Sequence, residues 1–379
     1  MFRFVPYILK NVFRQRTRTL LTVSGAAVAL FVFSFVGAVR HGLDQLTRGS
    51  QSERSLIVFQ ANRFCPFTSK LPEDYANRIG KLAGVREVVP IQVFTNNCRA
   101  SLDVVVFHGV PPEKLRSARD LRLVSGSWDE FRGRRDAALV GQAVARRRGL
   151  SVGQRFSIGE LTVTVAGIFQ AAPAEENFVY TQLEFLQRTR GLRAVGTVTQ
   201  FEVRLNEDAD VDAVARAIDD TFRGSQVVTD TRPRGVFEAN AVGDLVDLIG
   251  FANYLAYACI GLVLALVATT TVMAVQDRVR EHALLQTLGF SGQRIFALVL
   301  AETLLVSLAG GLVGVGLAVG FLAVSGMAIG TEGVTIAFLP SWTLLTTGLI
   351  VSAAVGLVAG LVPAWQAGRA EIVTALRQA

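Results

Sequence analysis

The sequence predicts an integral membrane protein with four transmembrane α-helices and a large α+β extracytoplasmic domain between the first and second of them. Three observations lead to this fold class. The chain is 51% hydrophobic, with a mean hydropathy of +0.41. Only 18% of its residues are charged, which is below the roughly 25% of ordinary soluble domains. Its apolar residues are also gathered into four long runs, which indicates membrane spans rather than one globular core.

Each of the four runs is long enough to cross a bilayer. A helix rises about 1.5 Å per residue, so about 20 residues cross a hydrocarbon core of about 30 Å. The predicted spans are residues 20–40, 248–275, 295–327 and 342–362. The first run is longer than the roughly 7–15 apolar residues of a signal peptide and has no clear cleavage site. We therefore interpret it as a retained helix.

The excess basic charge lies beside the spans, on one side. Segment 1–19 carries five basic residues and no acid, and segments 276–294 and 363–379 are each net positive by one. Block 41–247 is nearly neutral, with 27 basic and 26 acidic residues, and loop 328–341 has no Lys or Arg. Because positive charge stays on the cytoplasmic side, we expect a multi-pass protein of the bacterial cytoplasmic (inner) membrane with both termini cytoplasmic. No basic patch remains elsewhere, which excludes nucleic-acid binding.

The extracytoplasmic block 41–247 alternates between strand-like and helix-like segments. Strands are predicted at Ser55–Gln60, Val85–Thr95, Leu102–Gly109, Ala137–Val140, Leu161–Phe169, Thr199–Leu205 and Gln226–Thr229. Helices are predicted from 72 to 82 and from 208 to 222, where apolar residues recur at helical spacing. We expect 55–109 and 199–230 to form one subdomain, with about 110–198 inserted between them.

Two cysteines follow predicted strands of this block. Cys65 comes shortly after the first strand and Cys98 shortly after the second. Strands joined by a crossover helix run parallel, so both cysteines should lie at one edge of the sheet. An oxidising compartment would permit a disulfide between them; two unrelated cysteines are the alternative. Cys259 lies in a span and is interpreted as a packing residue.

Two span helices are expected to continue beyond the membrane. The sequence keeps helical character from Phe237 into the second span, so one helix is expected from about residue 236 to 276. Residues 40–51 after the first span are free of proline. Together these extensions would form a stalk that transmits displacement between the cytoplasmic face and the outer domain.

The cytoplasmic loop 276–294 predicts a short helix. Gln276–Leu288 suits that helix, Gly289 stands where a left-handed C-cap belongs, and Ser291 is placed to cap the third span. Leu284 and Leu288 share one face, beside the charged residues 280 and 281, which makes a small apolar knob. A helix lodged in the membrane interface is the alternative interpretation.

This segment resembles the Q-E-R-x-R-E-I-G-x-L-x-A-L-G motif of FtsX-like and MacB-type ABC transporter permeases. The matching residues are Gln276, Arg278, Arg280, Glu281, Leu285, Leu288 and Gly289, with Glu302, Gly310, Gly311 and Gly314 in the following span. Asp277 replaces the usual acid, and His282-Ala283 stand where Ile-Gly is common. Segments 16–22, 139–153 and 363–377 resemble further parts of the same family.

The resemblance implies a dimer of permease copies driven by two separate ABC ATPase subunits. The ATPase would bind ATP and Mg, so no cofactor is expected in this chain. The coupling helix, comprising Gln276, Arg278, Arg280, Glu281, Leu284, Leu285, Leu288 and Gly289, would dock on the ATPase. A periplasmic adaptor protein and membrane lipids are further candidate partners.

The residues show no catalytic or metal site. No Gly-Lys-Ser/Thr phosphate loop occurs in the sequence. The string Gly149–Gly153 fits a nucleophile elbow, but three arginines rather than a buried strand precede it, so a structural turn is expected. His41, His108 and His282 are predicted at different depths and cannot share a metal ion.

Polar and small residues inside the spans predict helix contacts. Glu302 is expected to face protein and to pair with an arginine near the start of the first span, or else to be protonated; proton coupling is the less favoured role. Small-residue spacings permit close helix approach, within one subunit or across a dimer. These glycines are Gly310, Gly311, Gly314, Gly316, Gly320, Gly356 and Gly360.

The functional hypothesis is a non-enzymatic permease subunit that converts ATP hydrolysis in a partner into motion of the outer domain, exporting or extracting an amphipathic or lipid-linked cargo. The plain chemistry of the spans argues against a solute pathway through the bilayer. The alternatives are a transmembrane signalling scaffold that activates an extracytoplasmic partner such as a cell-wall hydrolase, and a receptor with no ATPase.

Overall fold

The chain divides into two compact units. The computed structural model describes residue 14 and residues 16–51, 54–63, 68–95, 105–325, 327–331, 334–338 and 341–369. One unit, here called the membrane unit, comprises Met1–Arg40, Leu248–Val324 and Pro340–Ala379. The other, here called the interspan domain, comprises His41–Asp247 and Ser325–Leu339. Cys65 and Cys98 lie outside the described residues, so the predicted disulfide stays a prediction.

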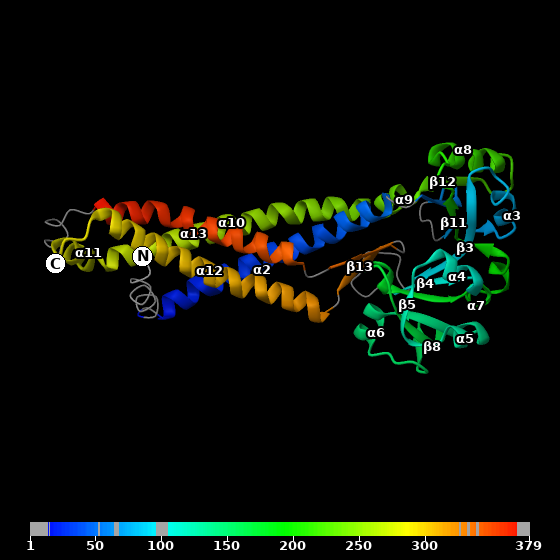
Figure 1. Cartoon of the computed structure of the whole chain (residues 1–379), viewed down its shortest axis with the longest axis horizontal. Helices are drawn as coiled ribbons and strands as arrows, with labels where there is room; N and C mark the ends of the chain where they lie inside the picture. The colour runs from blue at the N-terminus through cyan, green and yellow to red at the C-terminus, as the bar shows by residue number, and fades with distance from the viewer. Residues whose placement is uncertain are drawn as a thin grey trace. The chain divides into compact units, whose positions relative to one another are not determined.

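Four of the described helices are long and apolar enough to cross a membrane. They are α2 (Arg16–Gln51), α10 (Gly243–Asp277), α12 (Gly292–Ser325) and α13 (Trp342–Arg369). Each contains most or all of one predicted span, so the prediction of four transmembrane helices is confirmed. Figure 1 shows them as the long blue, yellow-green, orange and red coils.

The helices α2 and α10 both extend beyond their apolar stretches, but the second extension is interrupted. A separate helix, α9 (Arg234–Ala241), precedes α10. The break lies at Val242, whose φ of −105° and ψ of 7° are outside the helical region. One continuous helix from 236 was therefore a wrong prediction. The next residue is Gly243, and glycine is a poor helix former because its backbone loses the most entropy on ordering.

Backbones of α12 and α2 approach closely at two glycines. A methyl group on Gly310 would lie 2.6 Å from the Cβ atom of Ala26. A methyl group on Gly314 would lie 2.2 Å from the backbone oxygen of Ala27. Neither distance leaves room for a side chain, so these positions require glycine in this packing arrangement. Such close approach stabilises helix pairs in lipid mainly through van der Waals contact.

A second close approach joins α12 and α13. Ser307 and Ser352 each donate a hydroxyl hydrogen bond to the other's backbone oxygen, at 2.7 and 2.6 Å. A Cβ atom on Gly311 would meet the side chain of Ser352, and one on Gly356 would meet Ser307. Gly360 packs one turn further along, against Thr303 of α12. The hydrogen bonds between these serines were not predicted from the sequence.

Gly316 and Gly320 make no close contact with the described residues of the chain. A Cβ atom at either position would meet none of them within 4 Å. Because a helix turns about 100° per residue, Gly316 points about 200° away from Gly314 and faces the other side of α12. Packing of these two glycines across a dimer, the other expected arrangement, stays a prediction.

The interspan domain is built on one long mixed sheet. Its strands run in the order β12-β1-β11-β3-β4-β9-β6-β8-β5, with β7 paired to β8. The strands are β1 (Ser55–Gln60), β3 (Val85–Thr95), β4 (Val106–Val110), β5 (Arg122–Gly126), β6 (Ala137–Gly141), β7 (Arg155–Ile158), β8 (Leu161–Gln170), β9 (Phe178–Gln182), β11 (Gln200–Leu205) and β12 (Thr229–Pro233). The strand predicted at 226–229 corresponds to β12, which begins only at Thr229, the last residue of the predicted range.

The parallel arrangement of β1 and β3 comes about through a third strand. β11 lies between them and pairs antiparallel with both. β3 is also the link between two parts of the sheet, because 85–91 pair with β11 and 92–95 pair with β4. Beyond β4, all strands come from residues 122–182.

Short helices cover the sheet. The described ones are α3 (Tyr75–Ile79), α4 (Pro112–Ala118), α5 (Trp128–Gly133), α6 (Gln142–Arg148), α7 (Leu183–Thr189), α8 (Val211–Phe222) and the 3-10 turns η3 (Glu175–Asn177) and η4 (Leu192–Ala194). A two-stranded ladder of β2 (Leu71–Pro72) and β10 (Thr197–Val198) completes this part.

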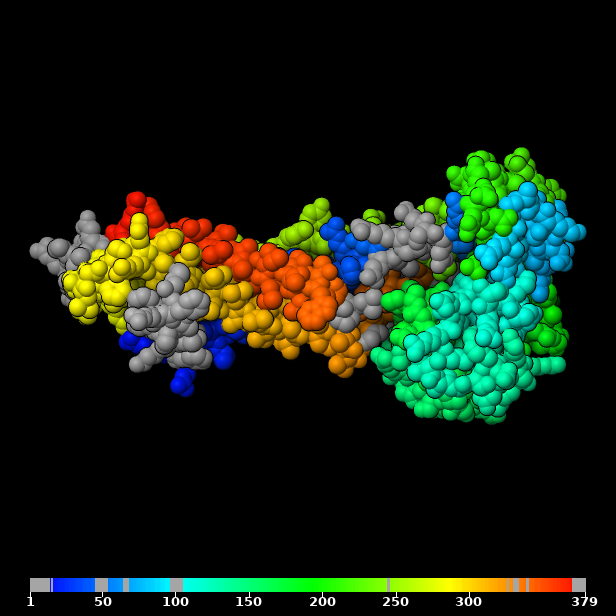
Figure 2. Space-filling model, viewed as in Figure 1, coloured from blue at the N-terminus to red at the C-terminus, as the bar shows by residue number. Residues whose placement is uncertain are grey.

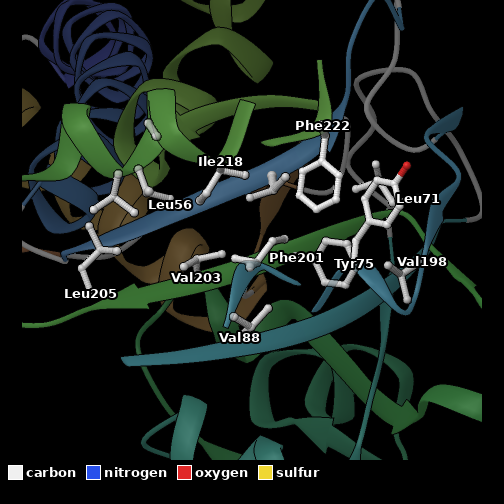
Figure 3. Close-up of a cluster of buried hydrophobic side chains, with 14 of the residues drawn as sticks. Leu56, Leu71, Tyr75, Val88, Val198, Phe201, Val203, Leu205, Ile218 and Phe222 are labelled. Atoms are coloured by element: carbon white, nitrogen blue, oxygen red, sulfur yellow. The ribbon is translucent and has the colours of Figure 1, made fainter. Parts of the chain in front are cut away.

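The core under α8 shows how the helical pattern is used. The buried face of α8 contains Val214, Ala215, Ile218 and Phe222, as the sequence spacing predicted in part. The ring of Phe222 stacks on that of Tyr75 with centroids 4.0 Å apart. Figure 3 shows these rings above side chains from the strands. Burial of these apolar side chains is what attaches the helix to the sheet.

The loop between the third and fourth spans folds as part of the interspan domain. Residues 328–341 were predicted only as a short loop, yet they contain the hairpin β13 (Ala328–Thr331) and β14 (Val334–Ala337). Its β-branched residues suit a strand. The hydroxyl of Thr335 donates to the backbone oxygen of Ala174 at 2.7 Å. A Cβ atom on Gly42 would lie 2.5 Å from the backbone oxygen of Ala337. The hairpin therefore packs against both η3 and the α2 extension.

Gly314→Ala is expected to destabilise the helix bundle, whereas Gly316→Ala is expected to be neutral or stabilising. The first substitution forces a methyl group onto the α2 backbone, which costs about 1–3 kcal/mol as overpacking. The second adds a methyl group in open space and removes a glycine from a helix, worth up to about 1 kcal/mol. Thermal unfolding of both variants in detergent measures the difference. Equal melting temperatures would contradict the packing described above.

Phe222→Ala is expected to cost about 3–5 kcal/mol of unfolding free energy, because it empties a fully buried site between α3 and α8. Leu192→Ala is the matched control, since Leu192 is 85% exposed and surface changes stay within about 0.5 kcal/mol. Chemical unfolding of the full chain, followed by tryptophan fluorescence, provides the measurement.

Candidate functional site

A short helix joins the second and third spans. This helix, α11 (Val279–Thr287), is separated from α10 by Arg278, whose φ of −114° and ψ of 17° break the helix. Gly289, with a φ of +93°, ends the turn after α11 in the left-handed region that favours glycine. The helix predicted for 276–288 is present but starts three residues later, because Gln276 and Asp277 still belong to α10.

The side chain of Arg278 turns inward and pairs with the intramembrane acid. Its Nη1 atom lies 3.0 and 3.1 Å from the two carboxylate oxygens of Glu302. Arg18, near the start of the first span, lines the same pocket as Glu302, and the predicted pair between these two residues stays a prediction. Arg278 stands at the helix break, where its long side chain reaches α12, and it is itself only 7% exposed. The ion pair therefore ties the start of α11 to the third span.

Two further arginines, Arg18 in the first turn of α2 and Arg14 shortly before that helix, bind the same region. Arg18 pairs with Asp277 at 2.9 Å and also donates to the backbone oxygen of Thr270. Arg14 pairs with Glu281 at 2.6 Å. The Arg14 pair is largely exposed, and such pairs contribute at most about 1 kcal/mol. The first span is thus linked to both the end of α10 and the beginning of α11.

The outer face of α11 presents leucine side chains. Leu284 is 59% exposed and Leu288 is 71% exposed, with the exposed residue Arg280 on the same helix. Leu285 is half-buried, and Gln276 and Gly289 are exposed. Figure 2 shows the yellow surface that includes this segment open on the face in view. The residues expected to form an apolar knob thus face away from the membrane unit.

The inner face of α11 contains the two residues that depart from the family motif. His282 and Ala283 are buried. Burial lowers the pKa of His282, and the charge of Arg278 lowers it further, against a smaller opposite effect of Glu281. The imidazole is therefore neutral at neutral pH. The departure from Ile-Gly affects the packing of α11 on the spans rather than its exposed surface.

A small polar cavity lies where α2, α10, α11 and α12 meet. Its volume is about 60 Å³, room for a few water molecules at roughly 10–15 Å³ each. The polar residues lining it are Arg18, Thr19, Thr22, Thr270, Thr271, Arg278, His282, Glu302 and Thr303. The threonines were not predicted as part of a site, although the run of three at 269–271 inside an apolar span was a signal.

Other predicted features have simple structural roles where the structure describes them. The string Gly149–Gly153 is a turn: Gly149, with a φ of +63°, follows α6, and β7 starts shortly afterwards. Among the described residues, no group of three or more His, Cys, Asp or Glu side chains could hold a metal ion. Chemically, the arrangement around α11 is a helix held on its inner side with an exposed apolar face.

Family models match most of the chain. The MacB-like periplasmic core domain matches residues 19–221, and the FtsX-like permease C-terminal domain matches residues 253–372. The chain belongs to the family of FtsX-like and MacB-type ABC transporter permeases. α11 and the helix α12 with Glu302 lie within the FtsX-like match. The permease is accordingly a multi-pass membrane protein.

Two curated relatives are similar over part of their length. The macrolide export ATP-binding/permease protein MacB of Bdellovibrio bacteriovorus is 23% identical over 329 residues, covering 80% of this permease and 49% of that protein. The uncharacterized ABC transporter permease YknZ of Bacillus subtilis is 30% identical over 105 residues, covering 28% of this permease and 25% of that protein. The permease thus aligns with at most about half of either relative.

Solved structures similar to the permease include two extracytoplasmic regions. The periplasmic region of MacB from Actinobacillus actinomycetemcomitans is 10% identical, covers 49% of this chain and 92% of that chain, and gives a TM-score of 0.37. The extracellular domain of the noncanonic ABC-type transporter YknZ from Gram-positive bacteria is 15% identical, covers 47% and 99%, and gives a TM-score of 0.35.

Removing one partner of the Arg278–Glu302 pair is expected to lower the stability of the membrane unit. Removing both partners is expected to restore much of that stability. Arg278→Leu or Glu302→Leu leaves a buried charge without its partner, at a cost of about 3–5 kcal/mol. The double variant buries two apolar groups instead, which is often neutral. Thermal unfolding in detergent gives the four stabilities of this cycle. Arg14→Leu is the control, since its exposed pair should matter little. Additive single effects would show that the pair is not coupled.

Proposed function

We propose that this permease couples ATP hydrolysis by a separate ABC ATPase subunit to movement of its interspan domain. In this proposal the movement exports or extracts an amphipathic or lipid-linked cargo, and the chain itself is not an enzyme. ATP and Mg are bound by the ATPase, not by this chain. The observation that carries the proposal is α11, a helix held firmly on its inner side while its leucine face stays exposed.

The contacts of α11 suit a helix that receives a force. An amphipathic helix can dock its apolar face in a groove of a partner, and Leu284 and Leu288 provide such a face. Two sets of ion pairs hold the helix on its inner side. Arg278, just before α11, pairs with Glu302 of α12. Arg14 and Arg18, at the beginning of the first span, pair with Glu281 of α11 and with Asp277 at the end of α10. A displacement of α11 by a docked ATPase would therefore move the ends of the spans with it.

Long helices supply the path for that displacement. α2 has 36 residues and α10 has 35. At about 1.5 Å per residue each is roughly 50 Å long, well beyond a hydrocarbon core of about 30 Å. Both helices continue from the membrane unit into residues of the interspan domain. The proposal places both termini and α11 in the cytoplasm and the interspan domain outside, as the distribution of basic residues favours.

Several features favour cargo handling outside the bilayer. The charged side chain within the apolar runs, Glu302, is paired internally with Arg278, which does not suggest a solute path through the spans. In the interspan domain, apolar and polar residues together line an open groove: Phe94, Ile158, Leu161 and Leu186 with Thr95, Glu160, Thr189 and Arg190. A groove of this mixed lining suits transport of an amphipathic cargo better than the alternative of a scaffold that only activates an extracytoplasmic partner.

The proposed assembly contains a second copy of the permease. Of the four spans, α10 has the smallest share of residues buried within the chain, which leaves apolar surface for lipid or for another copy. A homodimer with two ATPase subunits is the arrangement we propose. A periplasmic adaptor is a further proposed partner.

Replacing Leu284 and Leu288 together by Asp is expected to abolish association with the ATPase, because two charges would be buried in an apolar groove. The matched control is Leu192→Asp, the same change at an exposed leucine of the interspan domain. Affinity purification of the tagged full chain from its host membranes, followed by mass spectrometry for an ABC ATPase, provides the measurement. Unchanged ATPase recovery with the double variant would overturn the docking role of α11.

A further inference from the structure

Five charged side chains form a buried cluster in the interspan domain. The two basic residues are Arg119 and Arg234, and the three acids are Glu175, Glu202 and Glu238. Their side chains are between 3% and 14% exposed. Ionised groups are rarely buried to this extent in soluble domains unless they are paired, because removal from water is costly. The cluster therefore needs a structural explanation.

The cluster is held by ion pairs that share partners. Arg119 binds Glu202 through both ends of its guanidinium group, at 2.6 and 2.5 Å, and its Nε atom lies 3.2 Å from Glu175. Arg234 binds Glu238 at 2.8 Å and lies 3.8 Å from Glu175 and 3.9 Å from Glu202. Both arginines thus contact both Glu175 and Glu202, so the groups form one network rather than separate pairs.

The members of the network come from three different parts of the domain. Glu202 lies on β11, in the part of the sheet formed with β1, β3 and β12. Arg119 directly follows α4, and Glu175 begins η3, both in the segment that contributes the strands beyond β4. Arg234 and Glu238 lie on α9, one turn apart. The network joins both parts of the sheet to α9.

α9 is also attached to the first part of the sheet by an apolar contact. The ring of Phe237 packs on that of Phe59 of β1, with centroids 5.3 Å apart, and Ile57 completes this small cluster. The helix is therefore bound to one part of the sheet by aromatic packing and to the other part through the ion pair of Arg234 with Glu175. Figure 1 shows α9 next to β12.

Glu175 stands where a second segment reaches the same point. The preceding residue, Ala174, accepts the hydrogen bond from Thr335 of β14. In the chain, β14 leads into α13, while α9 leads into α10. The turn η3 thus receives contacts from two segments that continue directly into membrane spans.

The central acid of the network, Glu202, is ionised at neutral pH. Burial by itself would raise the pKa of Glu202, but the charge and hydrogen bonds of Arg119, with help from Arg234, hold it at about 2. Neighbouring His108 is uncharged, because burial and then Arg119 lower its pKa to about 3. The ion pairs of Glu202 with Arg119 and Arg234 therefore keep their charged, directional character at neutral pH.

We propose that this network is the joint through which α9 moves both parts of the sheet together, with Arg234 and Glu175 as its positioning residues. An apolar contact can slide, whereas paired charges have few favourable arrangements, so the network holds α9 in one orientation relative to η3. The source of the movement rests on the proposed function. The joint itself does not depend on what drives it.

Hydrogen exchange of the full chain in detergent, followed by mass spectrometry, tests the joint without any partner. In Glu175→Gln and in Arg234→Gln, the backbone amides of both α9 and η3 are expected to exchange faster by at least about tenfold, because loss of either residue releases both segments. The amides of α11 and α12 should not change. Arg188→Gln is the matched control, since it breaks an exposed ion pair on α7, and it should leave α9 and η3 as in the wild type.

The joint is overturned if each variant speeds hydrogen exchange only in the segment that carries the substitution. If Glu175→Gln opens only η3, and Arg234→Gln only α9, the two segments are not coupled. Arg234→Lys guards against a variant that does not fold, because it retains the charge while losing the fork-shaped guanidinium. This variant should show a smaller, but still joint, increase at α9 and η3; an increase at α9 alone would count against the proposal.

A second arm uses the wild-type permease with its co-purified ATPase. Addition of ATP is expected to change exchange in both β1 and β8, one strand from each part of the sheet. In Glu175→Gln the change should be lost at β8 while ATP hydrolysis continues. A change that persists at β8 would overturn the joint. Absence of an associated ATPase from the wild type would instead contradict the proposed function, and the first arm would still decide the joint.

Discussion

The apolar bilayer is the constraint on which the structure of this permease depends. Lipid tails remove the hydrophobic driving force between helices, so the spans must associate through close contact and a few internal polar bonds. The glycines of α12 and α13 and the reciprocal hydrogen bonds between Ser307 and Ser352 meet this requirement. The spans are thus held together by close backbone contacts and paired hydroxyl groups.

The same constraint keeps charged residues near the ends of the spans, where their ion pairs connect one segment to the next. At the α11 end, Arg278 and Arg18 each connect α10 or α11 to another span. In the interspan domain, Arg234 connects α9 to η3 and β11. In both places an ion-paired arginine accompanies a helix break: Arg278 stands at the break itself, and Arg234 begins α9, the helix that ends at the break at Val242. A break allows a change of direction, and the ion pairs then determine which segment follows which. These features are the physical basis of the proposed coupling.

Much of the fold could be predicted from local patterns. The four spans, the short helix after α10, the left-handed Gly289 and most strands were found from hydropathy, spacing and turn residues. Two local predictions were wrong, the continuous helix from about residue 236 and the start of the strand at 226–229. Other differences concern contacts between distant residues. No described residue of the chain lies within 4 Å of a Cβ atom placed on Gly316 or Gly320, and their packing across a dimer stays a prediction. The ion pair found for Glu302 is with Arg278, at the break between α10 and α11, which the sequence did not predict.

By itself, the sequence determined how many helices cross the membrane, which segments are strands and where the exposed leucines of α11 lie, because length, hydropathy and periodicity act over a few neighbouring residues. Only the tertiary structure decided that β11 separates β1 from β3, that the hairpin of β13 and β14 belongs to the interspan domain, and that five charges from three segments share one buried network. Those choices depend on which surfaces meet in space, and burial then selects partners whose separation along the chain carries no local signal.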